Sequence, residues 1–339
     1  MNLRVFLTVA CLALPSASFA QSAAAPGAHS EDVQTRAETL LDKARQLSDI
    51  RSPNAPAFRL KATFSFIGKD LETVQGTYSE VWVSNSQWSR ETVVKDSRRV
   101  EVGGATRMWQ LDNTEDFPEQ AAQLPGLMNI FPPKSASFAF ESIADQAEVD
   151  PPAECAITKL YLRHRKFAFC FDKKSGALLE KSFPETRPMN SVDISCNYGL
   201  FHKFGDRWFP REMACSEDRH KKIEANIAEL SVEPSPDPAL FTPPPGAIEI
   251  GTCSVATFTP NPKSRFGFRD EASAVSVMLS LVVDTKGKAQ NVRVLRPGSK
   301  NYDKSALETV RRWRFQPGTC NGDPMPLQIR VEVDFRLYR

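Results

Sequence analysis

The sequence predicts an α+β protein in which one large antiparallel β-sheet, curved or closed, is followed by a small domain of β-β-α-β order. The first observation is that apolar and polar residues alternate in run after run between Pro56 and Glu233, as in half-buried strands. These runs are Phe58–Phe66, Gly76–Ser84, Trp88–Val94, Lys166–Phe171, Ala177–Phe183, Val192–Tyr198, Arg207–Pro210 and Ile223–Val232. The second observation is that residues 274–337 form two alternating runs, a helical run and a final alternating run. So many strands separated by turns favour one large antiparallel sheet.

The composition limits the classes of function. A chain of 339 residues allows about two domains, and 41% hydrophobic with 25% charged residues is typical of globular proteins. A formal net charge of +2 gives no broad positive field, so nucleic acid is not an expected partner. The 25 Pro and 22 Phe against only 16 Gly favour short strands with stiff connections over Gly-rich nucleotide-binding loops.

Residues 1–20 have the features of a secretory signal peptide. A charged start at Arg4 precedes an apolar run of 10 residues from Val5 to Leu14, and Ser18-Phe19-Ala20 forms a small-residue cleavage site. This run is shorter than the roughly 20 residues of a transmembrane helix. We therefore expect cleavage before Gln21 and a periplasmic or secreted protein, with an uncleaved inner-membrane anchor as the alternative.

Cysteine usage predicts disulfide bonds. Cys11 lies in the signal peptide, and the mature chain keeps Cys155, Cys170, Cys196, Cys215, Cys253 and Cys320. An even number in an oxidising compartment indicates disulfides, although the sequence alone allows many connectivities. Because the first four lie in successive strand-like runs, we expect the nearest-neighbour pairs Cys155–Cys170 and Cys196–Cys215, with Cys253–Cys320 across the last domain. No Cys-x-x-Cys pair or zinc-ligand His spacing occurs, so neither a metal nor a cofactor is expected.

Changes in the pattern give the domain limits and the helices. The N-terminal segment 21–55 has apolar residues at helical spacing, which predicts one helix ending near Ser48. Residues 56–241 form the predicted sheet domain, with a helical insertion or flap at Glu115–Leu127. A Pro-rich linker is expected at 242–257, and the last domain at 258–339.

The last domain is expected to contain a hairpin, a helix and a final strand. The hairpin comprises the alternating run Val275–Val283 and Gln290–Leu295, and the helix covers Asp303–Arg312. In the final strand, Ile329 to Leu337, apolar residues alternate with charged ones. We expect its apolar face to pack on the helix and its charged face to contact water.

This last domain resembles the TonB C-terminal domain family over roughly Phe258–Arg339, about a quarter of the chain. The resemblance is carried by Pro260-Asn261-Pro262, Leu281 to Lys288, Val292-Arg293-Val294, Tyr302 to Leu307, Trp313 to Pro317 and Asn321 to Pro324. In that family, an extended segment of an outer-membrane transporter adds a strand to a sheet edge. The resemblance implies a receiving edge on the final strand, with Gln328, Arg330, Glu332, Asp334 and Arg336 as candidate partner-binding residues. The alternative is that these charges guard the edge against pairing with another chain. The family's membrane helix and long spacer have no counterpart here, so we expect docking rather than force transmission.

The middle region, roughly Phe58–Phe241, resembles the LolA/LolB-like lipoprotein carriers and related outer-membrane sorting proteins. The residues that carry this resemblance are Gly76 to Trp82, Gln87 to Glu91 and Asp237 to Pro244. It implies a strongly curved sheet with helices covering its concave face, a face that can hold acyl chains. Candidates for the hydrophobic lining are Phe64, Phe66, Trp82, Trp88 and Trp109, and the alternative is that these residues pack against the helices as ordinary core.

No arrangement of catalytic residues stands out. The sequence contains no recognisable Ser-His-Asp set, nucleophile elbow or metalloprotease helix, so we expect no enzymatic activity. The expected function is that of a periplasmic TonB-family protein that binds an envelope partner, such as a TonB-dependent outer-membrane transporter, in connection with envelope transport. The alternatives are a lipid or lipoprotein carrier that uses the concave face of the middle domain, and an undetected hydrolase.

Overall fold

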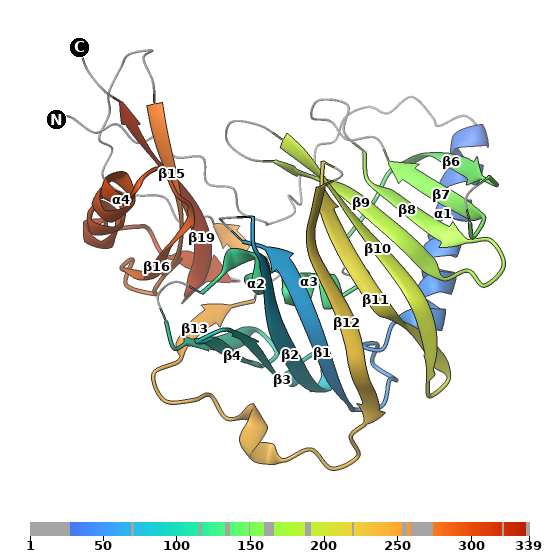
Figure 1. Ribbon diagram of the computed structural model, residues 1–339, viewed down its shortest axis with the longest axis horizontal. Helices are drawn as coiled ribbons and strands as arrows, with labels where there is room; N and C mark the ends of the chain where they lie inside the picture. The colour runs from blue at the N-terminus through green and yellow to red at the C-terminus, as the bar shows by residue number, and fades with distance from the viewer. Residues whose placement is uncertain are drawn as a thin grey trace.

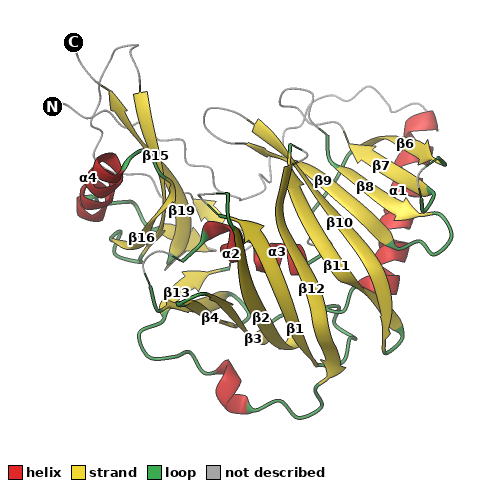
Figure 2. Ribbon diagram, viewed as in Figure 1, coloured by secondary structure: helices red, strands yellow, loops and turns green. Residues whose placement is uncertain are grey.

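The computed structural model describes residues 28–68, 71–114, 117–132, 136–148, 150–158, 166–186, 191–218, 220–252, 256–258, 274–320 and 322–336. Strands dominate these residues (Figure 2). The predicted signal peptide lies outside them. No helix within the described ranges has the length and apolar character needed to cross a membrane.

A sheet of 13 antiparallel strands forms the middle domain (Figure 1). Five strands come first, namely β1 (Phe58–Ile67), β2 (Thr73–Ser84), β3 (Gln87–Val94), β4 (Ser97–Gly103) and β5 (Arg107–Asp112). Seven follow, namely β6 (Phe140–Gln146), β7 (Ala153–Thr158), β8 (Ala168–Asp172), β9 (Leu178–Thr186), β10 (Ser191–Phe204), β11 (Arg207–Glu217) and β12 (His220–Val232). The two meanders join because β12 pairs with β1. The curved antiparallel sheet predicted from the alternating runs is therefore confirmed.

Helices cover one face of this sheet (Figure 1). They are α1 (Ala28–Ser48), which packs against β6, β8, β9 and β11, and α2 (Glu119–Ala122) with α3 (Leu124–Met128), of which α3 packs against β11. Alternate residues of β1, from Phe58 to Phe66, point to this concave face and are buried. Together with the stripe Ala37, Leu41 and Ala44 of α1 they belong to one continuous core. The burial of an apolar strand face beneath helices is the main stabilising contribution here.

The segment after β12 crosses to the other end of the sheet. It contains the short helix η1 (Pro238–Phe241), which packs against β3 and β4, and then strand β13 (Ile248–Gly251). β13 pairs with β5 and completes the sheet at that edge. The stretch that the sequence suggests as a linker, 242–257, thus contains a strand of the middle sheet.

The C-terminal domain contains two small sheets. One has the order β16-β15-β19, built from β15 (Ala274–Val283), β16 (Ala289–Arg296) and β19 (Leu327–Arg336), with α4 (Lys300–Arg312) on one face. The other contains β14 (Ala256–Phe258), β17 (Gly318–Cys320) and β18 (Asp323–Met325). The predicted β-β-α-β order is confirmed, with β17 and β18 inserted before the last strand.

Gly287 is required by the hairpin between β15 and β16. Its φ is +76°, and a Cβ atom there would lie 2.1 Å from the Phe315 carbonyl oxygen. The Phe315 amide donates a hydrogen bond to the Gly287 oxygen at 2.9 Å. Only glycine combines this backbone conformation with so close an approach.

Candidate functional site

Strand β19 lies at an edge of its sheet. Within the described part of the chain it pairs with β15 alone, in a regular register that includes Val275 with Phe335 and Leu279 with Val331. One side of β19 is therefore occupied by β15, and its other side is a sheet edge. The sequence identified this strand as the candidate partner-binding strand, and the structure gives it the required position.

The two faces of β19 have different surroundings. Its apolar residues Ile329, Val331, Val333 and Phe335 are buried in the core that includes Ala306 and Val310 of α4. The expectation that the charged face contacts water is met only in part, because Gln328 is exposed and Arg330 and Asp334 are half-buried, but Glu332 is buried. Glu332 is only 4% exposed and pairs with Arg296 of the same sheet. Elsewhere on this face, Arg293 and Arg330 form ion pairs with the middle domain, which therefore covers part of the face.

Two arginines connect that face to the middle domain. Arg293 of β16 and Arg330 of β19 both lie opposite Ser280 of β15 in the strand register, so the three residues form one row. Arg293 forms an ion pair with Asp112 at the end of β5. Arg330 forms one with Glu119 of α2, with 3.6 Å between Nη2 and Oε1. A main-chain contact adds to them, because the Gly251 amide of β13 donates to the Pro326 oxygen at 2.7 Å.

The other candidate edge residues also have partners within the chain. Gln328 Nε2 donates to Ser280 Oγ at 3.0 Å, and Ser276 Oγ donates to Asp334 Oδ1 at 2.5 Å. Glu332 pairs with Arg296.

Burial, followed by the charge of Asp334, raises the pKa of Glu332. The side chain of Arg336 lies outside the described residues. These polar side chains are thus occupied by neighbours, and the feature of β19 best suited to an incoming chain is its main-chain edge.

A buried row of charges on the concave face leads toward this contact. Strand pairing places Leu60, Glu80, Arg90, Glu101 and Gln110 in one row across β1 to β5. Arg90 donates to Glu101 at 2.7 and 3.2 Å and stacks over the Trp88 ring. Charged residues at inward positions of alternating strands are the sequence signal that could have revealed this row, because such positions are normally apolar.

Asp112 joins this row to the C-terminal domain. Besides Arg293, it accepts hydrogen bonds from Arg99 at 2.7 and 3.1 Å and from Gln110 at 2.8 Å. Burial lowers the pKa of Arg99 to about 10, although Glu101 acts in the opposite direction. Burial and the charge of Arg99 lower the pKa of Arg293 to about 10. Both guanidinium groups are therefore still charged at neutral pH, and Asp112 is an anion shared between two cations from different domains.

The concave face is filled by residues 117–131, here called the plug, together with α1. Leu124 and Met128 of the plug are fully buried, Leu127 is nearly so, and α3 packs against β11. Three cationic side chains donate hydrogen bonds to main-chain carbonyl oxygens at the C-terminal end of the plug. Two of the acceptors lie within the plug, and the third belongs to the residue that follows it. Each donor–acceptor distance is 2.9 Å, from Arg51 to Met128, from Lys181 to Asn129, and from Arg45 to Pro132.

The candidate lining residues Phe64, Phe66 and Trp82 are buried in this core, with Trp88 packed against it. They have the surroundings of ordinary core. Trp109 does not belong with them, so its inclusion in the lining is wrong. Trp88 pairs with Gly103 and Gly103 with Met108, so Met108 is the concave-face residue of β5 and Trp109 points to the opposite face. Successive side chains of a strand point to opposite faces of the sheet, and composition alone does not show which of two neighbouring residues lies on the concave face.

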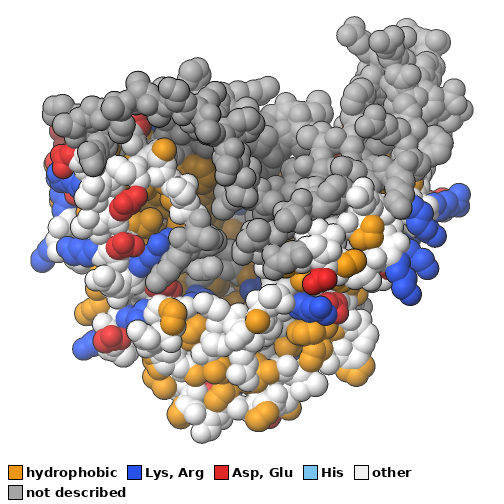
Figure 3. Space-filling model, turned by 180° about the vertical axis from the view of Figure 1, so that it is seen from behind, with side chains coloured by type: hydrophobic (Ala, Val, Ile, Leu, Met, Phe, Trp, Pro, Cys, Tyr) orange, Lys and Arg blue, Asp and Glu red, His pale blue; other side chains and the backbone are white. Residues whose placement is uncertain are grey.

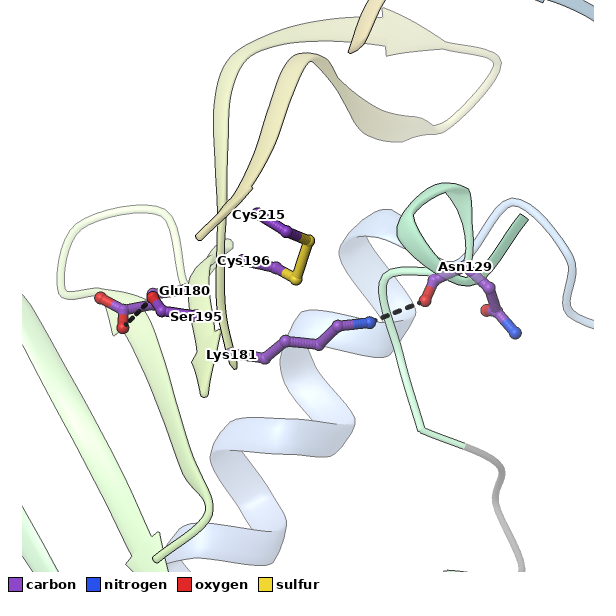
Figure 4. Close-up of a disulfide and its surroundings, with 6 residues drawn as sticks. All are labelled: Asn129, Glu180, Lys181, Ser195, Cys196 and Cys215. Atoms are coloured by element: carbon purple, nitrogen blue, oxygen red, sulfur yellow. Dashed lines mark hydrogen bonds between the residues drawn. A yellow bond between two sulfur atoms is a disulfide. The ribbon is translucent and has the colours of Figure 1, made fainter. Parts of the chain in front are cut away.

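Lys181 is the unusual residue of the β6 to β12 half of the sheet. Its row across the concave face otherwise contains only apolar residues, and these are Ile143, Ala156, Phe169, Cys196, Cys215, Ile223 and Phe66. Figure 4 shows its side chain beside the Cys196–Cys215 disulfide, reaching the Asn129 oxygen. It makes no ion pair with any residue that the structure describes. Burial lowers its pKa to about 8.

Two of the three predicted disulfides are confirmed. Cys155–Cys170 joins β7 to β8, and Cys196–Cys215 joins β10 to β11. In each pair the cysteines lie directly opposite one another, and the Cα atoms are 4.0 Å apart. Cys320 of β17 is also disulfide-bonded, but Cys253 lies outside the described residues. No group of His, Cys, Asp and Glu suited to a metal ion occurs within the described ranges.

On the face seen from behind, acidic and basic side chains lie together mainly along the left and right flanks, and the lower part of the described surface carries mostly neutral and hydrophobic side chains (Figure 3). With a net charge of +2, this agrees with the absence of a broad basic field.

Comparison with known proteins identifies the last domain. Residues 271–337 match the family model of the Gram-negative bacterial TonB protein C-terminal domain. Protein TonB of Xanthomonas campestris pv. campestris, from strains B100 and ATCC 33913, is 34% identical over 62 residues. That alignment covers 18% of this chain and 28% of each relative, so the chain spans less than a third of the length of these relatives. The resemblance of the last domain to the TonB C-terminal family is confirmed.

Three solved structures are similar to the larger part of the chain. An outer membrane lipoprotein-sorting protein domain from Vibrio parahaemolyticus has a TM-score of 0.39 at 12% identity, covering 60% of this chain and 97% of that one. A LolA superfamily protein from Nitrosomonas europaea has a TM-score of 0.39 at 10% identity, with 61% and 97% covered. A DUF1329 family protein from Desulfovibrio piger ATCC 29098 has a TM-score of 0.41 at 10% identity, with the same coverage.

Proposed function

We propose that this protein is a non-enzymatic component of the bacterial cell envelope, acting in the periplasm or after secretion, whose C-terminal domain binds an extended segment of an envelope protein by strand addition to β19. The observation that carries the proposal is the place of β19 at the edge of its sheet. An edge strand offers main-chain N–H and C=O groups to another chain. The match of residues 271–337 to the TonB C-terminal domain supports the same conclusion.

The partner that we propose is a TonB-dependent outer-membrane transporter, because the family resemblance implies that class. Recognition would be mainly through main-chain hydrogen bonds. The apolar face of β19 is packed beneath α4, and polar residues such as Glu332 and Asp334 have partners of their own. Side-chain selectivity would then come from residues of the partner that alternate over the two faces of the extended sheet.

Site-specific photo-crosslinking in cells tests the position of the partner. The two exposed residues Gln328 of β19 and Gln290 of β16 both lie opposite Val282, so they occupy equivalent positions at opposite edges of one sheet. A p-benzoylphenylalanine at position 328 is expected to form an adduct with an outer-membrane transporter, and the same group at 290 is the matched control. Equal capture at the two positions, or no transporter captured at 328, contradicts the proposal.

A pair of proline substitutions tests the main-chain mechanism. Neighbouring amides of a strand point to opposite sides, so one of Val333 and Asp334 donates toward β15 and the other toward the free edge. Proline removes that donor. We expect Val333→Pro and Asp334→Pro to differ, with one damaging the fold, as seen by circular dichroism, and the other leaving the fold intact but abolishing the crosslink. A folded proline variant of the edge-facing residue that still forms the crosslink refutes strand addition.

A second candidate function is that of a lipid or lipoprotein carrier. The observation that favours it is the partly exposed aromatic cluster of Phe138, Phe167 and Phe183 on the core side of the sheet, beside the wholly buried part of the concave face. An acyl chain could occupy more of that face only after the plug had moved. Mass spectrometry of organic extracts from the purified mature protein tests this candidate. A stoichiometric lipid supports it, and its absence after purification without detergent opposes it.

A further inference from the structure

The partner-binding strand and the plug contact one another. α2 is the first turn of the plug, and in Figure 1 it lies on the side of β19 away from β15. The Arg330–Glu119 pair joins the two elements through their side chains, with 3.6 Å between Nη2 and Oε1. Arg330 points to the polar face of β19. A strand added beside β19 would place its own side chains on that face about 5 Å from Arg330, where they would compete with Glu119 of α2 for the same space.

We infer that docking of a partner strand on β19 is coupled to release of the plug from the concave face. This inference rests on the proposed function and adds a form of regulation to it. The plug carries the buried side chains of Leu124, Leu127 and Met128, so its release would uncover the apolar surface of the sheet beneath. The coupling gives the two domains a physical reason to be in one chain.

The Arg330–Glu119 ion pair is weak enough to break and re-form. The side chains of Arg330 and Glu119 are 34% and 24% exposed, and such partly exposed pairs contribute little to stability. The Arg293–Asp112 pair is far more buried, at 11% and 2%. It would keep the C-terminal domain attached while α2 separates from β19. Linkage also requires the effect to be reciprocal, so that a loosened plug makes β19 more accessible.

Hydrogen–deuterium exchange of the full mature chain tests the coupling without any partner. Arg330→Gln and Glu119→Gln each remove the same ion pair from a different domain. Each is expected to speed exchange of residues 117–131 by about two- to fivefold, and the double variant should add little to either single change. Glu91→Gln, which removes an exposed pair with Arg98 between β3 and β4, is the matched control and should leave exchange of the plug unchanged.

The two proposals fail in different ways. If both single variants are folded and the exchange of 117–131 is the same as in the wild type, the coupling is refuted whatever binds to β19. If a transporter is captured at position 328 while exchange of 117–131 is unchanged by its binding, the coupling is refuted and the proposed function stands. If the variants loosen the plug but no partner is captured, the contact between β19 and the plug is upheld and the proposed function is refuted.

Discussion

Lys181 gives the most quantitative prediction, because its environment sets a definite pH window. The substitution Lys181→Met keeps an unbranched side chain, one atom shorter than that of lysine, and removes its charge. In the folded protein burial lowers the pKa of Lys181 to about 8, against 10.5 in water. The folded state therefore loses this proton near pH 8, and the unfolded state keeps it until about pH 10.5. Between these values the unfolded state binds more protons, so the stability of the wild type rises with pH relative to the variant.

The size of this effect follows from the two pKa values. Their difference corresponds to about 3.4 kcal/mol at 1.36 kcal/mol per pH unit. Lys181 is only half-buried by its exposed area, and water screens part of the cost, so we expect about 1–3 kcal/mol. Below pH 8 the full cost of the buried ammonium group is present, and above pH 10.5 it is absent.

Urea unfolding followed by tryptophan fluorescence measures this difference at several pH values. The free energy of unfolding of the wild type minus that of Lys181→Met should increase by about 1–3 kcal/mol from pH 7 to pH 10.5, while contributions from other groups cancel in the subtraction. A difference that stays constant over this range, or one that decreases, refutes the assignment of Lys181 as a cation on an apolar face without an ion-pair partner among the described residues.

Two further predictions concern stability. Replacing Cys196 and Cys215 together by alanine removes a link between residues 19 apart in sequence and should lower the free energy of unfolding by about 3 kcal/mol, as measured by urea unfolding without reductant. Glu101→Gln removes the carboxylate to which Arg90, whose side chain is 19% exposed, is hydrogen-bonded, and should cost about 3 kcal/mol. Burial acts to raise the pKa of Glu101, but the charge and hydrogen bonds of Arg90 outweigh it and the pKa is lowered. The stability that this group contributes is thus present above about pH 4.5 and lost on acidification, so acid unfolding of Glu101→Gln should depend less on pH than that of the wild type. An equal acid dependence in the two proteins, or an unchanged urea midpoint in the cysteine variant, contradicts these assignments.

The sequence was sufficient for features that depend on local patterns. Alternation from Phe58 to Phe66 gives a strand with one buried face, and the adjacent strand-like runs containing Cys155 and Cys170 give a disulfide between neighbours. Patterns of this kind depend on residues close in sequence, since side-chain direction has a period of two in a strand.

Features that depend on contacts between segments far apart in the chain could not be predicted from the sequence. The assignment of Trp109 to the concave face failed because an aromatic residue can be half-buried on either face of a sheet, so its type does not show which face it occupies. The contacts of Arg293 with Asp112 and of Arg330 with Glu119 join segments far apart in the chain, so nothing local shows that the polar face of the last strand is covered. A lysine inside an apolar row, as at Lys181, becomes visible only once the strand register is known.

The central claim is that a partner chain adds as a strand to the free edge of β19. The most direct test is hydrogen–deuterium exchange of the full mature chain with a synthetic peptide spanning the N-terminal segment of a TonB-dependent transporter from the same bacterium. At saturating peptide, exchange of residues 327–336 is predicted to slow while exchange of residues 289–296, at the opposite edge of the sheet, is unchanged. Slower exchange at 289–296 instead, or no change at 327–336, would contradict the account.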